Sequence, residues 1–152
     1  MPPPPAATPV EPTPAPAEPV PSDPVPGRPV GWDRVAATAL SYRGVRYRNG
    51  GNDPEEGFDC SGFVWYVFAR EGIAVPRTVA EQYRAGATVA PEDTRAGDLV
   101  FFNTTGVSPS HVGIWIGGDE FVHAPSGSGE VRVERLGARY WSDRLVGIRR
   151  VD

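Results

Sequence analysis

The sequence has no lysine and only one cysteine, and none of its apolar runs is long enough to span a membrane. One cysteine excludes a disulfide within the chain, so a stable fold must come from its hydrophobic core. The formal net charge is -4, and the 15 basic residues, all of them arginine, are interspersed with acidic residues. This charge pattern argues against nucleic acid as a partner, because such domains usually carry a basic patch. The missing apolar run argues equally against a transmembrane segment.

The start of the chain, which reads MPPPP, lacks the basic and apolar segments of a targeting signal. We therefore expect this chain to carry no signal peptide and no membrane anchor. Residues 1–30 are rich in proline and almost free of large apolar side chains, a composition that favours extended polyproline II structure. We predict a disordered linker over residues 1–30, either a spacer or a leader without function, and one globular domain over residues 31–152.

Helical spacing of apolar side chains predicts three short helices in the first half of the domain, at residues 33–42, 60–71 and 78–85. Asp33 is a plausible N-cap for the first helix, and Gly72 a plausible C-cap for the second. The third opens with TVAE, a capping box. Residues 47–57 are dense in Gly, Asn, Asp and Pro, which indicates a loop. Cys60 is therefore predicted to lie at a helix N-terminus.

Short segments rich in β-branched and aromatic residues follow the helices and predict strands. They cover residues 98–103, 112–116, 121–124, 131–134 and 145–149, with Gly- or Ser-rich breaks between them. A run of helices followed by a run of strands indicates an α+β fold with an antiparallel sheet.

Cys60 is the one residue that suits nucleophilic catalysis by a thiol. The N–H groups and dipole at a helix N-terminus stabilise negative charge, so they lower a thiol's pKa. The same N–H groups can donate to the oxyanion of an acyl-transfer reaction. The alternative is a buried and inert cysteine, because free cysteine is among the most buried residue types.

His111 and His123 are the only histidines, and they lie in two strands of a predicted hairpin. A three-residue turn over residues 117–119 would pair Ile116 with Glu120 and make the two histidines diagonal neighbours on one face. Their Cα atoms would then be about 7–8 Å apart. A two-residue turn would put the two side chains on opposite faces. Taken singly, each histidine could equally be a surface or packing residue.

In that register Gly113 pairs with His123 and leaves space between the two imidazoles. Thiol catalysis requires a thiol, a base and a group that orients the base, and Cys60, His111 and His123 can supply all three. A zinc site is the other use for one cysteine and two histidines. These three residues lack the short paired spacing of structural zinc ligands, so we favour catalysis over a metal.

Several linked motifs resemble the NlpC-type (NlpC/P60) cell-wall cysteine peptidases, a papain-like family. They occur in the family's order between Val35 and Val151, and they read FDCSGFVWYVF, VPRTVAEQY, AGDLVFF, SHVGIWIGGDEFVHAP and YWSDRLVGIRRV. DCSG alone would be weak evidence, whereas the combination with GDLVFF and the hairpin motif is highly specific.

The resemblance implies a papain-like α+β core in which Cys60 is the nucleophile, His111 the base and His123 the third polar residue. It implies that Tyr47 supports the oxyanion or positions the substrate. It implies more weakly that Asp59 and Ser61, which flank Cys60, help to bind the substrate. No metal and no organic cofactor is implied.

The resemblance also implies a substrate, the stem peptides of peptidoglycan, cleaved between D-γ-glutamate and diaminopimelate through an acyl-enzyme. A location in the cell envelope, periplasmic or secreted, follows from that substrate, and we expect a monomer. Three alternatives stay open: a non-catalytic peptidoglycan-binding module, an antibacterial effector or lysin, and an amidase or acyltransferase with the same thiol chemistry.

Overall fold

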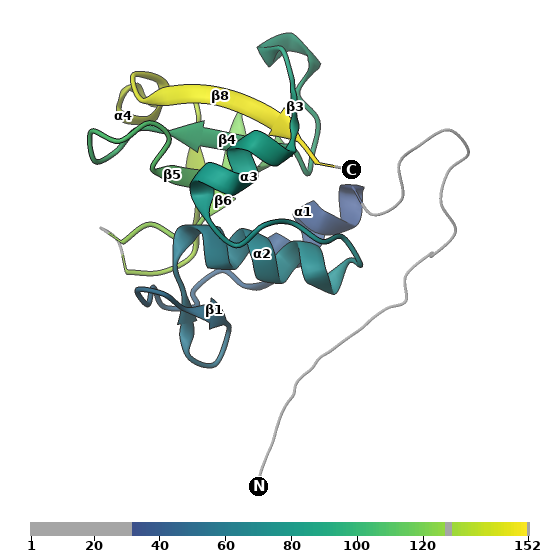
Figure 1. The fold of residues 1–152 in the computed structure, drawn as a ribbon, viewed down its shortest axis with the longest axis vertical. Helices are drawn as coiled ribbons and strands as arrows, with labels where there is room; N and C mark the ends of the chain where they lie inside the picture. The colour runs from purple at the N-terminus through teal and green to yellow at the C-terminus, as the bar shows by residue number, and fades with distance from the viewer. Residues whose placement is uncertain (1–31, 127–128, 152) are drawn as a thin grey trace, which may run out of the picture. The chain divides into compact units, whose positions relative to one another are not determined.

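The computed structural model of the protein describes residues 32–126 and 129–151, and the predicted linker over residues 1–30 lies outside the described residues. The helices are α1 (Trp32–Ser41), α2 (Cys60–Arg70), α3 (Val79–Ala85), the 3-10 helix η2 (Pro91–Asp93) and α4 (Arg139–Ser142). The strands are β1 (Asn52–Asp53), β2 (Gly57–Phe58), β3 (Ala87–Thr88), β4 (Leu99–Phe102), β5 (His111–Gly117), β6 (Glu120–His123), β7 (Arg132–Arg135) and β8 (Leu145–Arg150). The three longest helices come before the six-stranded sheet along the chain, with the short strands β1 and β2 between α1 and α2 and the short helix α4 between β7 and β8 (Figure 1).

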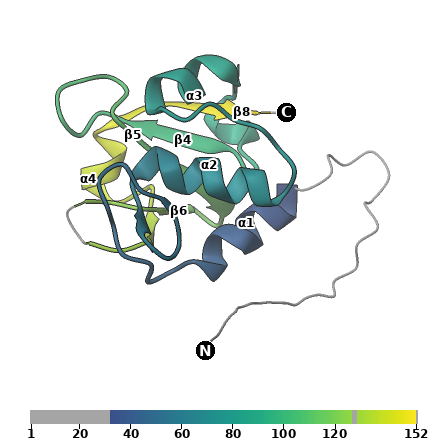
Figure 2. The same cartoon turned by 60° about the horizontal axis from the view of Figure 1, so that its bottom comes forward.

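Six of these strands form one sheet in the order β3-β8-β4-β5-β6-β7, and every neighbouring pair in it is antiparallel. Helices α1 and α2 lie side by side against one face of this sheet (Figures 1 and 2). The predicted α+β class with an antiparallel sheet is therefore confirmed. Within the described ranges, no helix combines the length and the apolar character that crossing a membrane requires.

The sheet has a core on each face, because successive residues of a strand point to opposite sides. Leu99 and Phe101 of β4 join the core beneath α1 and α2, while Val100 and Phe102 join a second core that includes Trp141 of α4. All four side chains are fully buried. This is why the strand reads as a continuous apolar run and not as an alternating one.

The caps of the helices partly match their predictions. Thr78 caps α3 as expected, because its Oγ1 accepts a hydrogen bond from the Glu81 N–H at 3.3 Å. The predicted N-cap role of Asp33 was wrong, since α1 already begins at Trp32. At the end of α2 the C-cap is Glu71, and Gly72 follows it with a φ of 79°. Gly72 supplies the left-handed conformation that commonly follows a C-cap.

The β5–β6 hairpin closes differently from the prediction. Gly117, not Ile116, pairs with Glu120, and the turn consists of two residues, Gly118 and Asp119. Both have positive φ, 61° and 68°, as a type I′ turn requires. A bulge at Ile116 adds one unpaired residue and so restores the predicted register further along the strands.

A buried ion pair joins the last strand to the start of β4. The Arg150 Nε and Nη2 atoms each lie 2.8 Å from a carboxylate oxygen of the fully buried Asp98. This paired, charge-assisted contact holds β8 against β4 at the end of the sheet. The sequence analysis did not identify this pair.

Candidate active site

The nucleophile candidate, Cys60, is the first residue of α2, as predicted. Asp59 caps the helix, and its Oδ1 accepts a hydrogen bond from the Gly62 N–H at 2.6 Å. Because Asp59 has an extended backbone and α2 starts immediately after it, the Cys60 side chain sits among unpaired N–H groups. The backbone N–H groups of Val112, Ser61 and Cys60 lie near the sulfur and lower the pKa of the thiol.

The protonation state of Cys60 differs from the sequence-based expectation. Burial, reinforced by the Asp59 carboxylate, raises the pKa of the thiol to about 11, although the three backbone N–H groups lower it. The helix N-terminus acts in the predicted direction, but desolvation of the thiolate outweighs it. At neutral pH the resting group is therefore a thiol, which needs a base before it can attack.

His111 and His123 face one another on the same side of the sheet. His111 Nε2 lies 2.7 Å from His123 Nδ1, and the two rings are nearly perpendicular at 77°. Both side chains are buried. Burial lowers the pKa of His111 to about 4 and, together with His111 and Arg132, lowers that of His123 to about 2. Both imidazoles are therefore neutral near pH 7, and a neutral imidazole is the form that accepts a proton.

Gly113 lies between the two histidines, as predicted. A Cβ atom at this position would come within 2.7 Å of Phe121 Cδ2 and 3.2 Å of His123 Cβ. A larger residue would therefore require the ring of Phe121 to move, and it would press on the Cβ atom of His123. The hydrogen bond between the histidines also argues against the zinc alternative. Because His111 Nε2 and His123 Nδ1 bind each other, these two nitrogens are not available to bind a shared metal.

Trp141 of α4 covers both imidazoles. Its ring stacks on His111 with centroids 5.6 Å apart and meets His123 edge-on at 4.9 Å. A cavity of about 220 Å³ opens beside this contact, lined by Thr104, His111, Pro125, Ser126, Glu134, Tyr140 and Trp141. Trp141 belongs to the motif YWSDRLVGIRRV, but its contact with the two histidines was not predicted.

Tyr47 lies close to the nucleophile. Its backbone pairs with Phe58, two residues before Cys60, and its N–H donates to the Gly129 carbonyl at 2.7 Å. Burial, followed by the charges of Cys60 and Asp59, raises the pKa of the Tyr47 hydroxyl. The phenol thus stays protonated near neutral pH and can donate a hydrogen bond.

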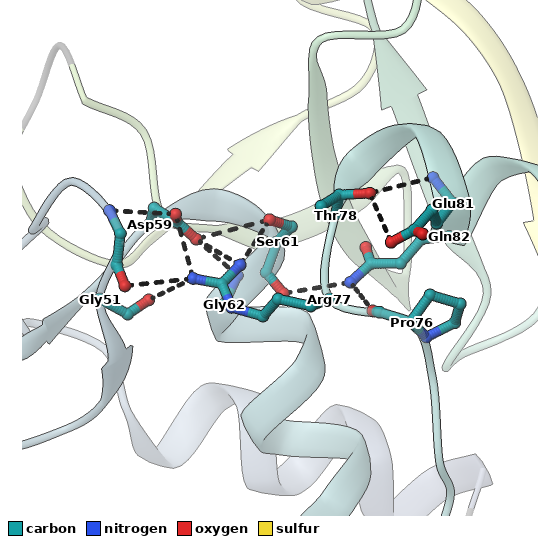
Figure 3. Close-up of polar contacts among 10 residues, drawn as sticks. Gly51, Asp59, Ser61, Gly62, Pro76, Arg77, Thr78, Glu81 and Gln82 are labelled. Carbon is teal, nitrogen blue, oxygen red and sulfur yellow. Dashed lines mark hydrogen bonds and ion pairs between the residues drawn. The ribbon is translucent and has the colours of Figure 1, made fainter.

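Asp59 and Ser61 are tied together by Arg77, which the sequence analysis missed (Figure 3). Arg77 Nη1 donates to Ser61 Oγ at 2.9 Å, and Nη2 donates to Asp59 Oδ2 at 3.2 Å. Nη2 also reaches the carbonyl oxygens of Gly50 and Gly51, both at 3.3 Å. This cluster joins the loop before α2 to the first turn of the helix and so fixes the backbone around Cys60.

A second anchor of the same turn comes from α3. Gln82 is fully buried, and its Nε2 donates to the carbonyl oxygens of Ser61 at 3.1 Å and Pro76 at 2.8 Å (Figure 3). The first turn of α2 is therefore held by two side chains from the segment that follows the helix. Of the sequence-predicted residues, the structure pairs His111 with His123 and places Cys60 near Tyr47 and near the backbone of Val112. It joins Asp59 and Ser61, on either side of Cys60, through Arg77.

Comparison with known proteins gives a consistent result. The family model described as the NlpC/P60 family matches residues 44–150. The gamma-DL-glutamyl hydrolase of Bacillus subtilis (strain 168) is 37% identical over 120 residues, which cover 77% of this chain and 29% of the relative. The murein DD-endopeptidase MepS/murein LD-carboxypeptidase of Escherichia coli (strain K12) is 40% identical over 119 residues, covering 78% and 62%. The chain thus spans less than two thirds of either relative.

Solved structures share the fold. An NLP/P60 family protein from Staphylococcus aureus Mu50 superposes with a TM-score of 0.71 at 39% identity, over 77% of this chain and 40% of the other. RipD from Mycobacterium tuberculosis, a non-catalytic NlpC/p60 domain protein adapted to peptidoglycan binding, superposes with a TM-score of 0.63 at 27% identity. That match covers 79% of this chain and 96% of RipD.

Proposed function

The chain belongs to the NlpC/P60 family, and on this premise we propose that it is a cysteine endopeptidase that cleaves the stem peptides of peptidoglycan. The observation that carries the proposal is the bonded pair of His111 and His123, the first residue of β5 and the last of β6. The backbone N–H of Val112, the residue after His111, lies near the Cys60 sulfur. A thiol, a neutral base and a group that orients the base are the components of thiol acyl transfer. The names of the two curated relatives, a murein endopeptidase and a gamma-DL-glutamyl hydrolase, support the same class.

In this mechanism His111 takes the thiol proton as the Cys60 sulfur attacks the substrate carbonyl. The N–H groups at the start of α2 and the hydroxyl of Tyr47 are available to stabilise the oxyanion. His111 then gives the proton to the leaving amine, which departs and leaves a thioester on Cys60. Water, deprotonated by His111, hydrolyses the thioester and restores the free thiol.

We propose the bond between D-γ-glutamate and diaminopimelate as the scissile bond. The name of the B. subtilis relative, a gamma-DL-glutamyl hydrolase, supports a γ-glutamyl carbonyl as the site of attack. In this mechanism His111 donates its proton to the leaving amine. The cavity of about 220 Å³ beside His111 would therefore hold the part of the substrate that carries this amine, the diaminopimelate.

The proposed substrate also suggests where the enzyme works. Peptidoglycan lies outside the cytoplasmic membrane, so we place the protein in the cell envelope, with residues 31–152 acting as a monomeric catalytic domain. Residues 1–30 then act as a spacer, because a proline-rich segment keeps a domain at a distance from its attachment point.

Digestion of purified soluble muropeptides, followed by mass spectrometry, tests the proposal. The wild-type chain is expected to release fragments that end at D-γ-glutamate, and Cys60→Ala is expected to release none. Glu56→Ala is the matched control, since Glu56 forms an exposed ion pair with Arg48 and belongs to no part of the site. Intact muropeptides with all three proteins would reject the peptidase for this substrate.

A second candidate function is peptidoglycan binding without catalysis. The thiol pKa of about 11 is compatible with this function, because a binding module needs no thiolate. RipD combines this fold with peptidoglycan binding. Co-sedimentation with purified sacculi, equal for wild type and Cys60→Ala and without fragment release, is the result expected of a binding module.

A further inference from the structure

We propose that Glu134 is a positioning residue that selects which nitrogen of His123, and through it of His111, carries the proton. Glu134 belongs to β7, which pairs with β6 so that His123 lies opposite Arg132, two residues before Glu134. The catalytic consequence of this inference rests on the peptidase function proposed above, whereas the proton positions themselves do not.

A chain of contacts runs from His111 through His123 to Glu134. His123 Nδ1 is occupied by His111 Nε2 at 2.7 Å. Its other nitrogen, Nε2, is buried and has no hydrogen-bond partner among the described residues. A carboxylate oxygen of Glu134 lies 3.6 Å from this nitrogen, so a small rotation of the glutamate side chain completes a hydrogen bond. A buried N–H group without a partner is costly, which favours that rotation.

A neutral imidazole has one N–H group, and its place decides what the neighbouring ring can do. The His123 side chain is fully buried, which favours the neutral ring. If His123 carries its proton on Nδ1, it donates to His111 Nε2, and the proton of His111 is forced onto Nδ1. No lone pair of His111 is then left for a thiol. If His123 carries its proton on Nε2, His111 donates from Nε2 and its Nδ1 is free to accept.

The productive arrangement therefore requires an acceptor at His123 Nε2, and the carboxylate of Glu134 supplies it. Arg132 does not, because a guanidinium only donates. The Arg132 Nε atom lies 3.2 Å from the same Glu134 oxygen, and this ion pair holds the carboxylate beside the histidine. Carboxylates commonly fix the tautomer of a functional histidine in this way.

The first measurement reads the proton positions directly, by long-range proton–nitrogen correlation NMR of the ¹⁵N-labelled chain near neutral pH. The chain has two histidines, so every imidazole signal belongs to His111 or His123. In the wild-type protein we expect both rings to be protonated at Nε2 and bare at Nδ1. In Glu134→Ala we expect a population of both rings protonated at Nδ1.

The second measurement is the rate on muropeptides. Glu134→Ala is expected to lower kcat about 10- to 100-fold with little change in KM, a typical effect of losing a group that orients a functional histidine. Glu134→Gln retains an acceptor oxygen and is expected to recover most of the Nε2-protonated form and of the rate. If Glu134 served only its ion pair with Arg132, then Arg132→Gln and Glu134→Ala would reduce kcat equally.

Two results overturn the inference: Nδ1-protonated rings in the wild-type protein, or Glu134→Ala with unchanged ring protonation. Thermal unfolding of each variant identifies any that lose the fold, and Glu134→Gln then carries the test. If the wild-type chain cleaves no muropeptide, the peptidase proposal fails, while the NMR comparison still decides the role of Glu134.

Discussion

The sulfur of Cys60 lies within hydrogen-bonding reach of the backbone N–H of Val112, the residue that follows His111 in β5. One short segment of backbone thus contacts the nucleophile and carries the candidate base. Because this segment is hydrogen-bonded to β4, with His111 opposite Phe102, it cannot shift without breaking the sheet. The separation of thiol and imidazole is therefore set by the sheet.

The first prediction concerns pH. Burial lowers the pKa of His111 to about 4, so His111 is a neutral base above that pH and a protonated, inactive one below it. We expect kcat/KM for muropeptide cleavage to stay high from neutral pH to about pH 5 and to fall as the pH drops through about 4. A half-maximal rate near pH 6.5, the ordinary value for histidine, would contradict this prediction.

Gly113→Ala tests the close packing of the histidine pair. The added methyl group would meet Phe121 Cδ2 at 2.7 Å and His123 Cβ at 3.2 Å, so the Phe121 ring must shift, and this ring packs on the imidazole of His123. We expect a loss of about 1–3 kcal/mol in the free energy of unfolding and a fall in kcat of at least about tenfold. Gly72→Ala is the control, because Gly72 also has a special role in the backbone but contacts nothing near the histidines. It should cost about 1–2 kcal/mol through its positive φ and leave kcat unchanged.

Arg77→Ala tests the cluster beneath the nucleophile. Its loss leaves the half-buried Asp59 carboxylate and the buried Ser61 hydroxyl without their shared partner, and we expect a loss of about 1–3 kcal/mol. Arg77→Lys should not restore stability, because a single ammonium nitrogen cannot reach from one position the partners that the two separated Nη atoms of the guanidinium contact. Arg48→Ala breaks the exposed ion pair with Glu56 and should change stability by less than about 1 kcal/mol. Urea unfolding of the three variants gives the comparison, and equal losses for Arg77→Ala and Arg48→Ala would refute it.

Asp98→Ala removes the buried partner of Arg150. Arg150 keeps its hydrogen bond to the Asp93 carbonyl, so we expect the lost charge-assisted bonds to cost about 1–3 kcal/mol and to weaken the attachment of β8 to β4. Because this pair contacts neither Cys60 nor the histidines, the rate per folded molecule should not change. The matched variant Asp143→Ala breaks the exposed pair with Arg139 and should have little effect on stability. Chemical unfolding combined with rates at low denaturant separates the two effects.

The larger elements were predictable because their side-chain patterns are long enough to show a period. The four strands β4, β5, β6 and β8 carry apolar runs bounded by glycine or polar residues, and each appeared near its predicted bounds. The two-residue strands β1, β2 and β3 and the four-residue α4 were missed, since so few residues contain no period. The small β1–β2 ladder forms within the predicted loop, where Gly57 and Phe58 pair with Asp53 and Asn52.

The residues of the site could be predicted from the sequence, but the backbone geometry that joins the histidines and the pKa of the thiol could not. His111 and His123 meet as their spacing indicated, but a bulge rather than a three-residue turn brings them to one face. A bulge depends on the whole sheet, which the local sequence does not contain. The thiol pKa went against the prediction because a helix N-terminus is visible in sequence and the extent of burial is not. The role of Arg77 could not be predicted because its partner Asp59 lies 18 residues away along the chain.

The sheet separates two hydrophobic cores, and the candidate active site takes residues from both sides. Cys60 packs with the core beneath α1 and α2, whereas Trp141 and Phe121, which hold the two histidines, belong to the core on the opposite face. Nucleophile and base are therefore supported by separate sets of side chains. Substitutions around Trp141 can change the basicity and position of the histidines without changing the surroundings of the thiol. Substitutions beneath α2 can change the surroundings of the thiol without changing those of the histidines. The two halves of the chemistry can be adjusted, in evolution or by design, one at a time.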